Sequence, residues 1–177
     1  MKFFSAIPTL AAVAFGAMSV VAQDSAAAII NELGQLTQLS ATARSDAASI
    51  TVNTAAIQFP VVLADVVGII SRVDTLTVQV QGDADFADQQ AAEIVTALGS
   101  SVQGIEQFLN ALAQQEANAA RVAFVVPVVA AVTALQGSVA ALEPALIATI
   151  PTQAGSAEVQ FSVLDNAFAS TIAAYTA

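Results

Sequence analysis

The side chains that could do chemistry in this chain are carboxylates, hydroxyls and a few arginines, because its 177 residues include no His and no Cys. Zinc, haem and iron–sulfur sites normally take ligands from those two residue types. Ser-His-Asp and Cys-His catalysis needs them as base or nucleophile. The sequence therefore excludes these cofactor sites and these catalytic arrangements as they are usually built.

The carboxylates form one cluster in the sequence, at Asp83, Asp85 and Asp88. This spacing is similar to the start of a calcium loop, but the glycine and the terminal Glu of such a loop are not in register. Acidic residues in the first turn of a helix give the simpler interpretation. Nothing in the sequence places two acids in a polar pocket, as a glycosidase requires. We expect no catalytic residue, no metal and no cofactor, hence a protein that is not an enzyme.

The charge balance restricts the partners. Four basic residues stand against fourteen acidic ones, for a net charge of −10. Binding of nucleic acid requires neutralisation of phosphates by Lys and Arg, and anionic lipid surfaces attract basic segments. We therefore expect no nucleic-acid partner and no electrostatic attraction to anionic membranes.

The N-terminus has the organisation of a secretory signal peptide. A positive start at Lys2 is followed by an apolar stretch, and Ala22 precedes polar residues. We expect cleavage after Ala22, which leaves a signal peptide over 1–22 and one mature domain over 23–177. A transmembrane anchor is the alternative, disfavoured because the apolar stretch is short. The expected location is extracellular, with association with a cell wall left open.

The mature chain is rich in alanine and has apolar residues at a helical period. Apolar stripes run over 29–57, 59–80 and 86–112, with Ile57 as the last member of the first stripe. We expect the first helix to begin after Asp24 or Ser25, the third to open at 83–85, and a last helix over about 154–175. Residues 75–81 also alternate like a strand, but one short strand would have no partner. Because the linkers are short, we expect an all-α protein, an antiparallel bundle of about five helices.

The remaining segment, 122–142, carries no charge and has apolar residues on all sides. Its 21 residues are long enough to cross a bilayer. Pro127, Gln136 and the lack of positive flanking charge argue against a membrane span. A helix that is apolar all round is otherwise buried. We therefore expect a central, buried helix that begins near Pro127, and no stable transmembrane span.

The candidate ligand-binding residues are the large apolar members of these stripes. Most such residues belong to a hydrophobic core, so they are core residues first and ligand contacts second. They line either an apolar cavity between helices or an adsorbing face, and they are Phe59, Leu63, Ile70, Phe108, Leu112, Phe124, Val128, Val132, Leu135, Phe161, Leu164 and Phe168.

A series of local blocks carries a resemblance to a known family. The blocks are 108–112 (FLNAL), 126–129 (VPVV), 142–151 (LEPALIATIP) and 173–175 (AAY). In this order, after a secretion signal, they resemble the fungal hydrophobic surface-binding protein A family, which includes cell-wall galactomannoproteins. The resemblance spans nearly the whole mature chain, although the family usually has a lysine where this chain has Thr149.

The resemblance implies a small secreted helical bundle without a catalytic motif. Its main implied role is adsorption to hydrophobic surfaces such as polyester or cuticle-like solids, with a secreted polyester hydrolase as the recruited partner. The alternatives are an extracellular bundle that binds a fatty acid or other lipid, and a cell-wall mannoprotein. A closed apolar interior would favour the lipid carrier, whereas a continuous exposed apolar patch would favour the adsorber.

Overall fold

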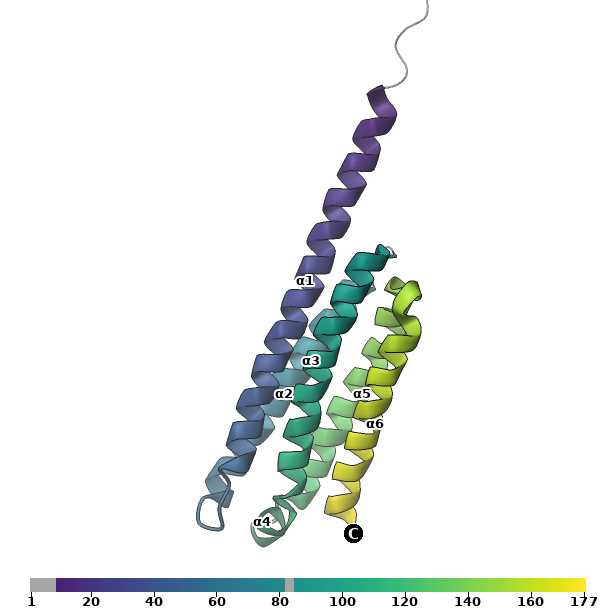
Figure 1. The fold of residues 1–177 in the computed structure, drawn as a ribbon. Helices are drawn as coiled ribbons and strands as arrows, with labels where there is room; N and C mark the ends of the chain where they lie inside the picture. The colour runs from purple at the N-terminus through teal and green to yellow at the C-terminus, as the bar shows by residue number, and fades with distance from the viewer. Residues whose placement is uncertain (1–8, 82–84) are drawn as a thin grey trace, which may run out of the picture.

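The computed structural model describes the backbone of residues 9–81 and 85–177, and the side chains of these residues from Ser25 onward. Every regular element in this part of the chain is helical (Figure 1). The elements are α1 (Thr9–Ala48), α2 (Ala55–Val80), α3 (Asp88–Ala113), α4 (Glu116–Arg121), α5 (Val125–Thr149), a 3-10 turn η1 (Pro151–Gln153) and α6 (Ala154–Thr176). The expected all-α bundle is confirmed, including a helix rather than a strand over 75–80.

The five long helices form a closed ring. Helix α1 packs against α2 and α3, α3 also packs against α6, and α5 completes the ring between α6 and α2. Within the described residues no helix occupies the axis of this ring. The axis is filled instead by side chains that converge from five sides, so the core is a column that runs along the bundle.

The ring has two layers of opposite direction. Helices α1, α3 and α6 run one way in the front layer of Figure 1, and α2 and α5 run the other way behind them. Consecutive long helices are therefore antiparallel, as their short linkers predict. The connection from α3 to α5, which are not neighbours in the ring, crosses one end of it. Helix α4, which packs on α2 and α5, covers one end, and η1, which packs on α3, α5 and α6, lies at the other.

Buried hydrogen bonds tie the front layer together. The Ser101 hydroxyl on α3 donates to the Leu33 carbonyl on α1 at 2.7 Å and lies 3.2 Å from the Thr37 hydroxyl. At the other seam, the Tyr175 hydroxyl on α6 donates to the Leu112 carbonyl on α3 at 2.6 Å. Gly104 lets α3 approach α1 closely, since a Cβ there would lie 3.3 Å from Ser40 Cβ. The helices of the front layer are therefore joined by directional hydrogen bonds as well as by apolar packing.

Helix α5 is held differently, by apolar contact. Among the described residues, no side-chain hydrogen bond joins α5 to another helix, and its buried stripe consists mainly of valine and leucine. Pro144 lies inside α5 and removes one backbone donor from its ladder. Apolar packing is not directional, so this side of the ring has fewer fixed contacts than the front layer.

The expectation that segment 122–142 forms a central, buried helix is wrong. Helix α5 is one of the five members of the ring, and Val126 on its outer side is 77% exposed. The sequence pattern predicted burial on all sides because alanine, glycine and valine also cover the outward face of α5. These residues are apolar, but on this face they are not buried. By length and composition alone, both α2 and α5 would be able to cross a membrane.

Two element boundaries also differ from the sequence prediction. The first helix ends at Ala48, and the turn after it places Ile57 on α2 with 75% of its surface exposed. Ile57 is therefore not part of the first buried stripe. The short helix α4 was not predicted, because six residues of Glu, Ala, Asn and Arg give no apolar period.

The predicted signal peptide falls partly outside the described residues, which begin at position 9. The rest of it forms the N-terminal end of α1, which extends beyond the other helices (Figure 1). The first buried side chain among those described is Ala26. Cleavage after Ala22 would therefore leave the described packing of α1 intact.

Candidate functional site

The structure brings most of the predicted ligand-binding residues together along the axis of the ring. Nine of the twelve are buried, from all the long helices except α1, and the other three are partly buried. The buried members are Phe59, Phe108, Leu112, Val128, Val132, Leu135, Phe161, Leu164 and Phe168. The partly buried members are Leu63, Ile70 and Phe124, which pack against the column from its edge.

The α2 contribution differs by one position from the sequence prediction. Val62, Ile69 and Leu76 are buried on α2, whereas Leu63 and Ile70 are only partly buried. Runs of adjacent apolar residues, such as Ile69 next to Ile70, fit either position of a helical stripe. The missed residues carry no separate signal in the sequence, because only the packing partners of α2 decide which neighbour turns inward.

Helix α1 contributes core residues that were not among the predicted ligand-binding residues. Ile29, Leu33 and Leu36 are buried on α1, together with Ala43. These residues belong to the predicted first stripe, so the period identified them as core. Their place in the same column as the Phe residues follows only from the ring arrangement.

An aromatic pair marks the α4 end of the column. The rings of Phe59 on α2 and Phe124, just before α5, stack with centroids 5.6 Å apart. Phe124 is held there by a backbone hydrogen bond of 2.9 Å to the Ala119 carbonyl. Ala123 before it has a φ of 60°, a left-handed conformation that the sharp turn into α5 imposes. At the opposite end, the Phe86 amide donates to the Thr149 carbonyl at 2.8 Å.

The few polar side chains inside the bundle have hydrogen-bond partners. The hydroxyls of Ser40, Thr77 and Thr149 donate to carbonyls one turn earlier in their own helices, at 2.8 Å each. The pKa of Tyr175 is raised, first by burial and then by Glu116. Since these groups are already satisfied, the column presents an apolar surface, of the kind that suits an acyl chain.

One buried carboxyl oxygen is an exception, and it lies at the seam of α1 and α2. Oδ2 of Asp65 has no hydrogen-bond partner among the described residues. Burial and, after it, the Asp46 carboxylate on α1 raise the pKa of Asp65 to about 6. Two carboxyls that face each other favour a state in which one keeps its proton.

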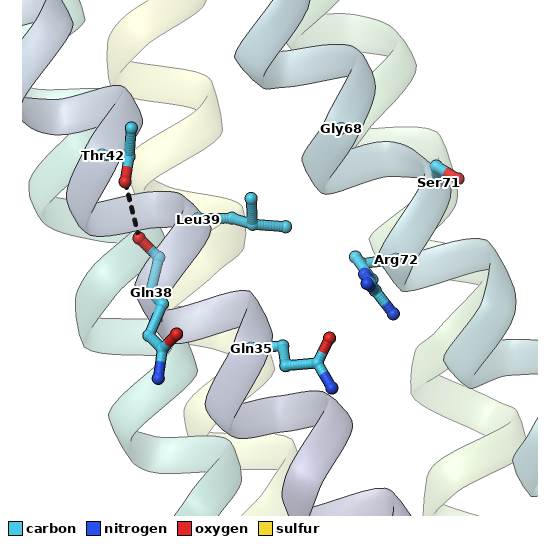
Figure 2. Close-up of a pocket in the computed structure, with 7 residues that line it drawn as sticks. All are labelled: Gln35, Gln38, Leu39, Thr42, Gly68, Ser71 and Arg72. Atoms are coloured by element: carbon cyan, nitrogen blue, oxygen red, sulfur yellow. Dashed lines mark hydrogen bonds between the residues drawn. The ribbon is translucent and has the colours of Figure 1, made fainter.

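The seam between α1 and α2 also contains a groove, shown in Figure 2. Its volume is about 480 Å³. Its lining is Gln35, Gln38, Leu39, Thr42, Gly68, Ser71 and Arg72. Leu39 and Gln35 extend from α1 toward α2, and Arg72 lies across the gap near Gln35. Arg72 donates to Glu32 at 3.0 Å in a partly exposed ion pair.

The three arginines therefore occupy different settings. Arg44 donates to Gln107 on α3 at 2.8 Å, and Arg121 is exposed at the end of α4. Arg72 lines the groove between α1 and α2. Sequence reasoning did not find this groove, because its polar lining comes from two helices whose pairing the sequence does not reveal.

A second apolar feature lies on the outer surface of α2. Ile57, Val61, Val67 and Val78, which we call the outer stripe, are exposed on α2. Ile57 and Val61 lie about one turn apart, and Val67 and Val78 lie about three turns apart on another side of the helix. A shallow depression of about 510 Å³ lies along this outer stripe, between Val67 and Val78. Within the described residues no three acidic side chains come together in a way that could hold a metal ion, and Asp83 of the predicted cluster lies outside them.

These features define a class of protein, a closed ring of five helices around an apolar column. No protein-family model and no curated protein sequence matches the chain. Solved structures do share the fold. AfMp4p in complex with palmitic acid is 20% identical with a TM-score of 0.80, covering 85% of this chain and 99% of that one.

Two further structures come from Penicillium marneffei. Ligand-binding domain 1 of the MP1 protein, complexed with arachidonic acids, is 13% identical with a TM-score of 0.73, over 82% of this chain and 94% of that one. Domain 2 of the same protein, complexed with multiple arachidonic acids, is 11% identical with a TM-score of 0.73, over 86% and 94%. At these identities the likeness shows the fold alone. The specific surface-binding family named from the sequence is thus not shown, whereas its helical-bundle fold is.

Proposed function

We propose that this protein is an extracellular, non-catalytic carrier that binds a long-chain fatty acid in the apolar column of its helical ring. The observation that carries the proposal is the column itself, which no helix occupies in the described residues and which is filled by apolar side chains that would have to part to admit a ligand. The fatty-acid complexes of proteins with the same fold support it. The sequence favoured surface adsorption first, and the comparisons give their support to the lipid-binding alternative instead.

Binding energy for such a ligand comes from the acyl chain. Each buried methylene contributes about 0.8 kcal/mol, so a chain of palmitate length gains roughly 10 kcal/mol before the costs of association. The column is closely packed by Phe59, Phe108, Phe161 and Phe168. A ligand in the column therefore requires the helices to move apart, and α5, joined to its neighbours by apolar contacts, is the helix we expect to shift outward to make room for it.

Native mass spectrometry of the secreted protein tests this proposal. The protein is freed of bound lipid by organic extraction, refolded and mixed with palmitic acid. We expect a discrete complex with palmitate, and a weaker complex with a short acid such as octanoate because fewer methylenes are buried. A protein that stays free at concentrations where it is folded would contradict the proposal.

A second candidate function, adsorption to hydrophobic solids, is favoured by the outer stripe of α2. Ile57, Val61, Val67 and Val78 expose apolar surface, and α5 beside it has no charged residue before Glu143. Recruitment of a polyester hydrolase and association with a cell wall remain predictions from the sequence resemblance.

Adsorption to polyester beads in high salt distinguishes this candidate. Val67 on α2 and Val159 on α6 are matched, at 64% and 62% exposed. If the α2 stripe adsorbs, Val67→Lys lowers the bound fraction several-fold while Val159→Lys leaves it unchanged, because a lysine in the contact must be desolvated. Equal behaviour of the two variants would exclude the α2 stripe as the adsorbing face.

A further inference from the structure

We infer that the groove between α1 and α2 is the entrance for the fatty acid and that Arg72 in its wall binds the carboxylate head group. This inference rests on the proposed fatty-acid function and assigns the polar end of the same site. An acyl chain in the column needs a route from solvent and a polar place for its carboxylate, because an ionised carboxylate is costly to bury unpaired.

The ends of the column are covered, so we infer that a ligand enters through the side of the ring. Helix α4 and the stacked pair of Phe59 and Phe124 lie at one end. Phe86, whose amide donates to the Thr149 carbonyl, and η1 lie at the other. A route through either end would have to break these contacts, whereas the α1–α2 groove already forms a recess in the side wall.

The α2 side of this groove includes a glycine. Gly68 has no side chain, and a Cβ built there meets nothing within 4 Å. Leu39 is the single apolar side chain in the lining, and it is partly buried and packs against the core. Movement of Leu39 would connect the groove with the interior, where Leu36 and Ile69 are buried on the same two helices.

The polar lining of the groove suits a carboxylate. A guanidinium presents five N–H donors in a planar fork that matches two carboxylate oxygens. Arg72 makes one hydrogen bond to Glu32, and its side chain stays 41% exposed. Gln35 and Ser71 add an amide and a hydroxyl to the same lining. Arg72 therefore has donors left for a ligand, although the negative charge of Glu32 competes with that ligand.

Three variants test the head-group assignment through the difference between palmitate and hexadecanol, which has the same chain without the charge. Arg72→Gln is expected to weaken palmitate binding about tenfold, as loss of a charge-assisted hydrogen bond predicts, and to leave hexadecanol unchanged. Glu32→Gln is expected to strengthen palmitate binding a few-fold, because it removes the competing acceptor. The control is Arg44→Gln, which makes the same charge change at the α1–α3 seam.

The entrance is tested by the rate of uptake. Gly68→Met places a side chain in the groove, where a Cβ meets nothing within 4 Å, and is expected to slow palmitate association several-fold. Gly137→Met on the exposed surface of α5, where a Cβ also meets nothing within 4 Å, leaves the rate unchanged. Palmitate affinities that fall equally in the Arg72 and Arg44 variants, or equal uptake by the two methionine variants, would overturn the assignment. Failure of the unaltered protein to bind palmitate would instead contradict the proposed function.

Discussion

At the residue scale, a few buried polar side chains join neighbouring helices, and two carboxyls face each other at one seam. Ser101 and Tyr175 donate buried hydrogen bonds across the front layer. Asp65 and Asp46 instead oppose each other where α1 meets α2. A carboxyl that is destabilised in the folded state makes stability depend on pH, because the folded and unfolded states then bind protons differently.

The first prediction concerns Asp65, whose pKa rises from the ordinary 3.8 to about 6. As the pH rises between these values, the unfolded state loses its proton first, so the free energy of unfolding falls and then levels off above pH 6. Asp65→Asn removes this loss and is expected to raise the free energy of unfolding at pH 7 by about 1 kcal/mol after solvent screening. Urea unfolding at pH 4 and pH 7 measures the effect.

Asp74→Asn is the control for this prediction, because it changes the net charge equally at an exposed position of α2. The account fails if the two variants show the same dependence on pH. The pKa of Glu143 is also raised, by burial and then by Asp165 and Glu158. The wild-type protein is therefore expected to be more stable in mild acid than at neutral pH.

At the scale of the element, the glycines lie in two kinds of position. Some lie where two helices are in close contact, and others lie at an open position on the surface of a helix. Gly104 lies where α3 approaches α1, whereas nothing lies within 4 Å of a Cβ built on Gly137 of α5. An alanine in an open helix position stabilises because it loses less conformational freedom on folding. An alanine at a close contact must first displace its neighbour.

The resulting prediction compares two alanine variants. Gly137→Ala is expected to raise the free energy of unfolding by about 0.5–1 kcal/mol. Gly104→Ala is expected to gain less or to destabilise, because its Cβ would lie 3.3 Å from Ser40 Cβ, which is fixed in a buried position. Chemical denaturation of both variants measures the difference. Equal stabilisation would mean that α1 and α3 are not packed as closely as described.

The elements show how far the sequence predicts this fold. Helical period and proline positions correctly predicted that the long segments are helices, because each has a buried stripe. They did not predict which residues are buried on α5, whose small outward residues resemble a buried face, or on α2, where Ile69 and Ile70 fit the period equally well. They also missed the α1–α2 groove, because Arg72 and Gln35 meet only when the two helices pair. The sequence predicts that the residues of the apolar column form a hydrophobic core. It does not predict that the helices around this core form a ring without a central helix.

At the scale of the whole molecule, the ring separates two apolar surfaces with different consequences. The column is enclosed by the helices, whereas the outer stripe of α2, with Ile57 and Val67, faces solvent. A fatty-acid carrier uses the first surface and an adsorbing protein uses the second. The chain has no disulfide to fix the ring, and the α5 side is joined by apolar contacts. These properties permit the opening that a ligand in the column requires.

The measurement that tests this account most directly is the position of bound palmitate by isotope-filtered NMR. Carbon-13-labelled palmitate is added to the unlabelled secreted protein, and nuclear Overhauser effects are recorded between its methylene protons and protein methyl groups. The account predicts contacts with interior methyls such as those of Val66, Val132 and Leu135, which are buried in the column. Contacts confined to exposed methyls such as those of Ile57 and Val67 would contradict it and place the ligand on the outer surface.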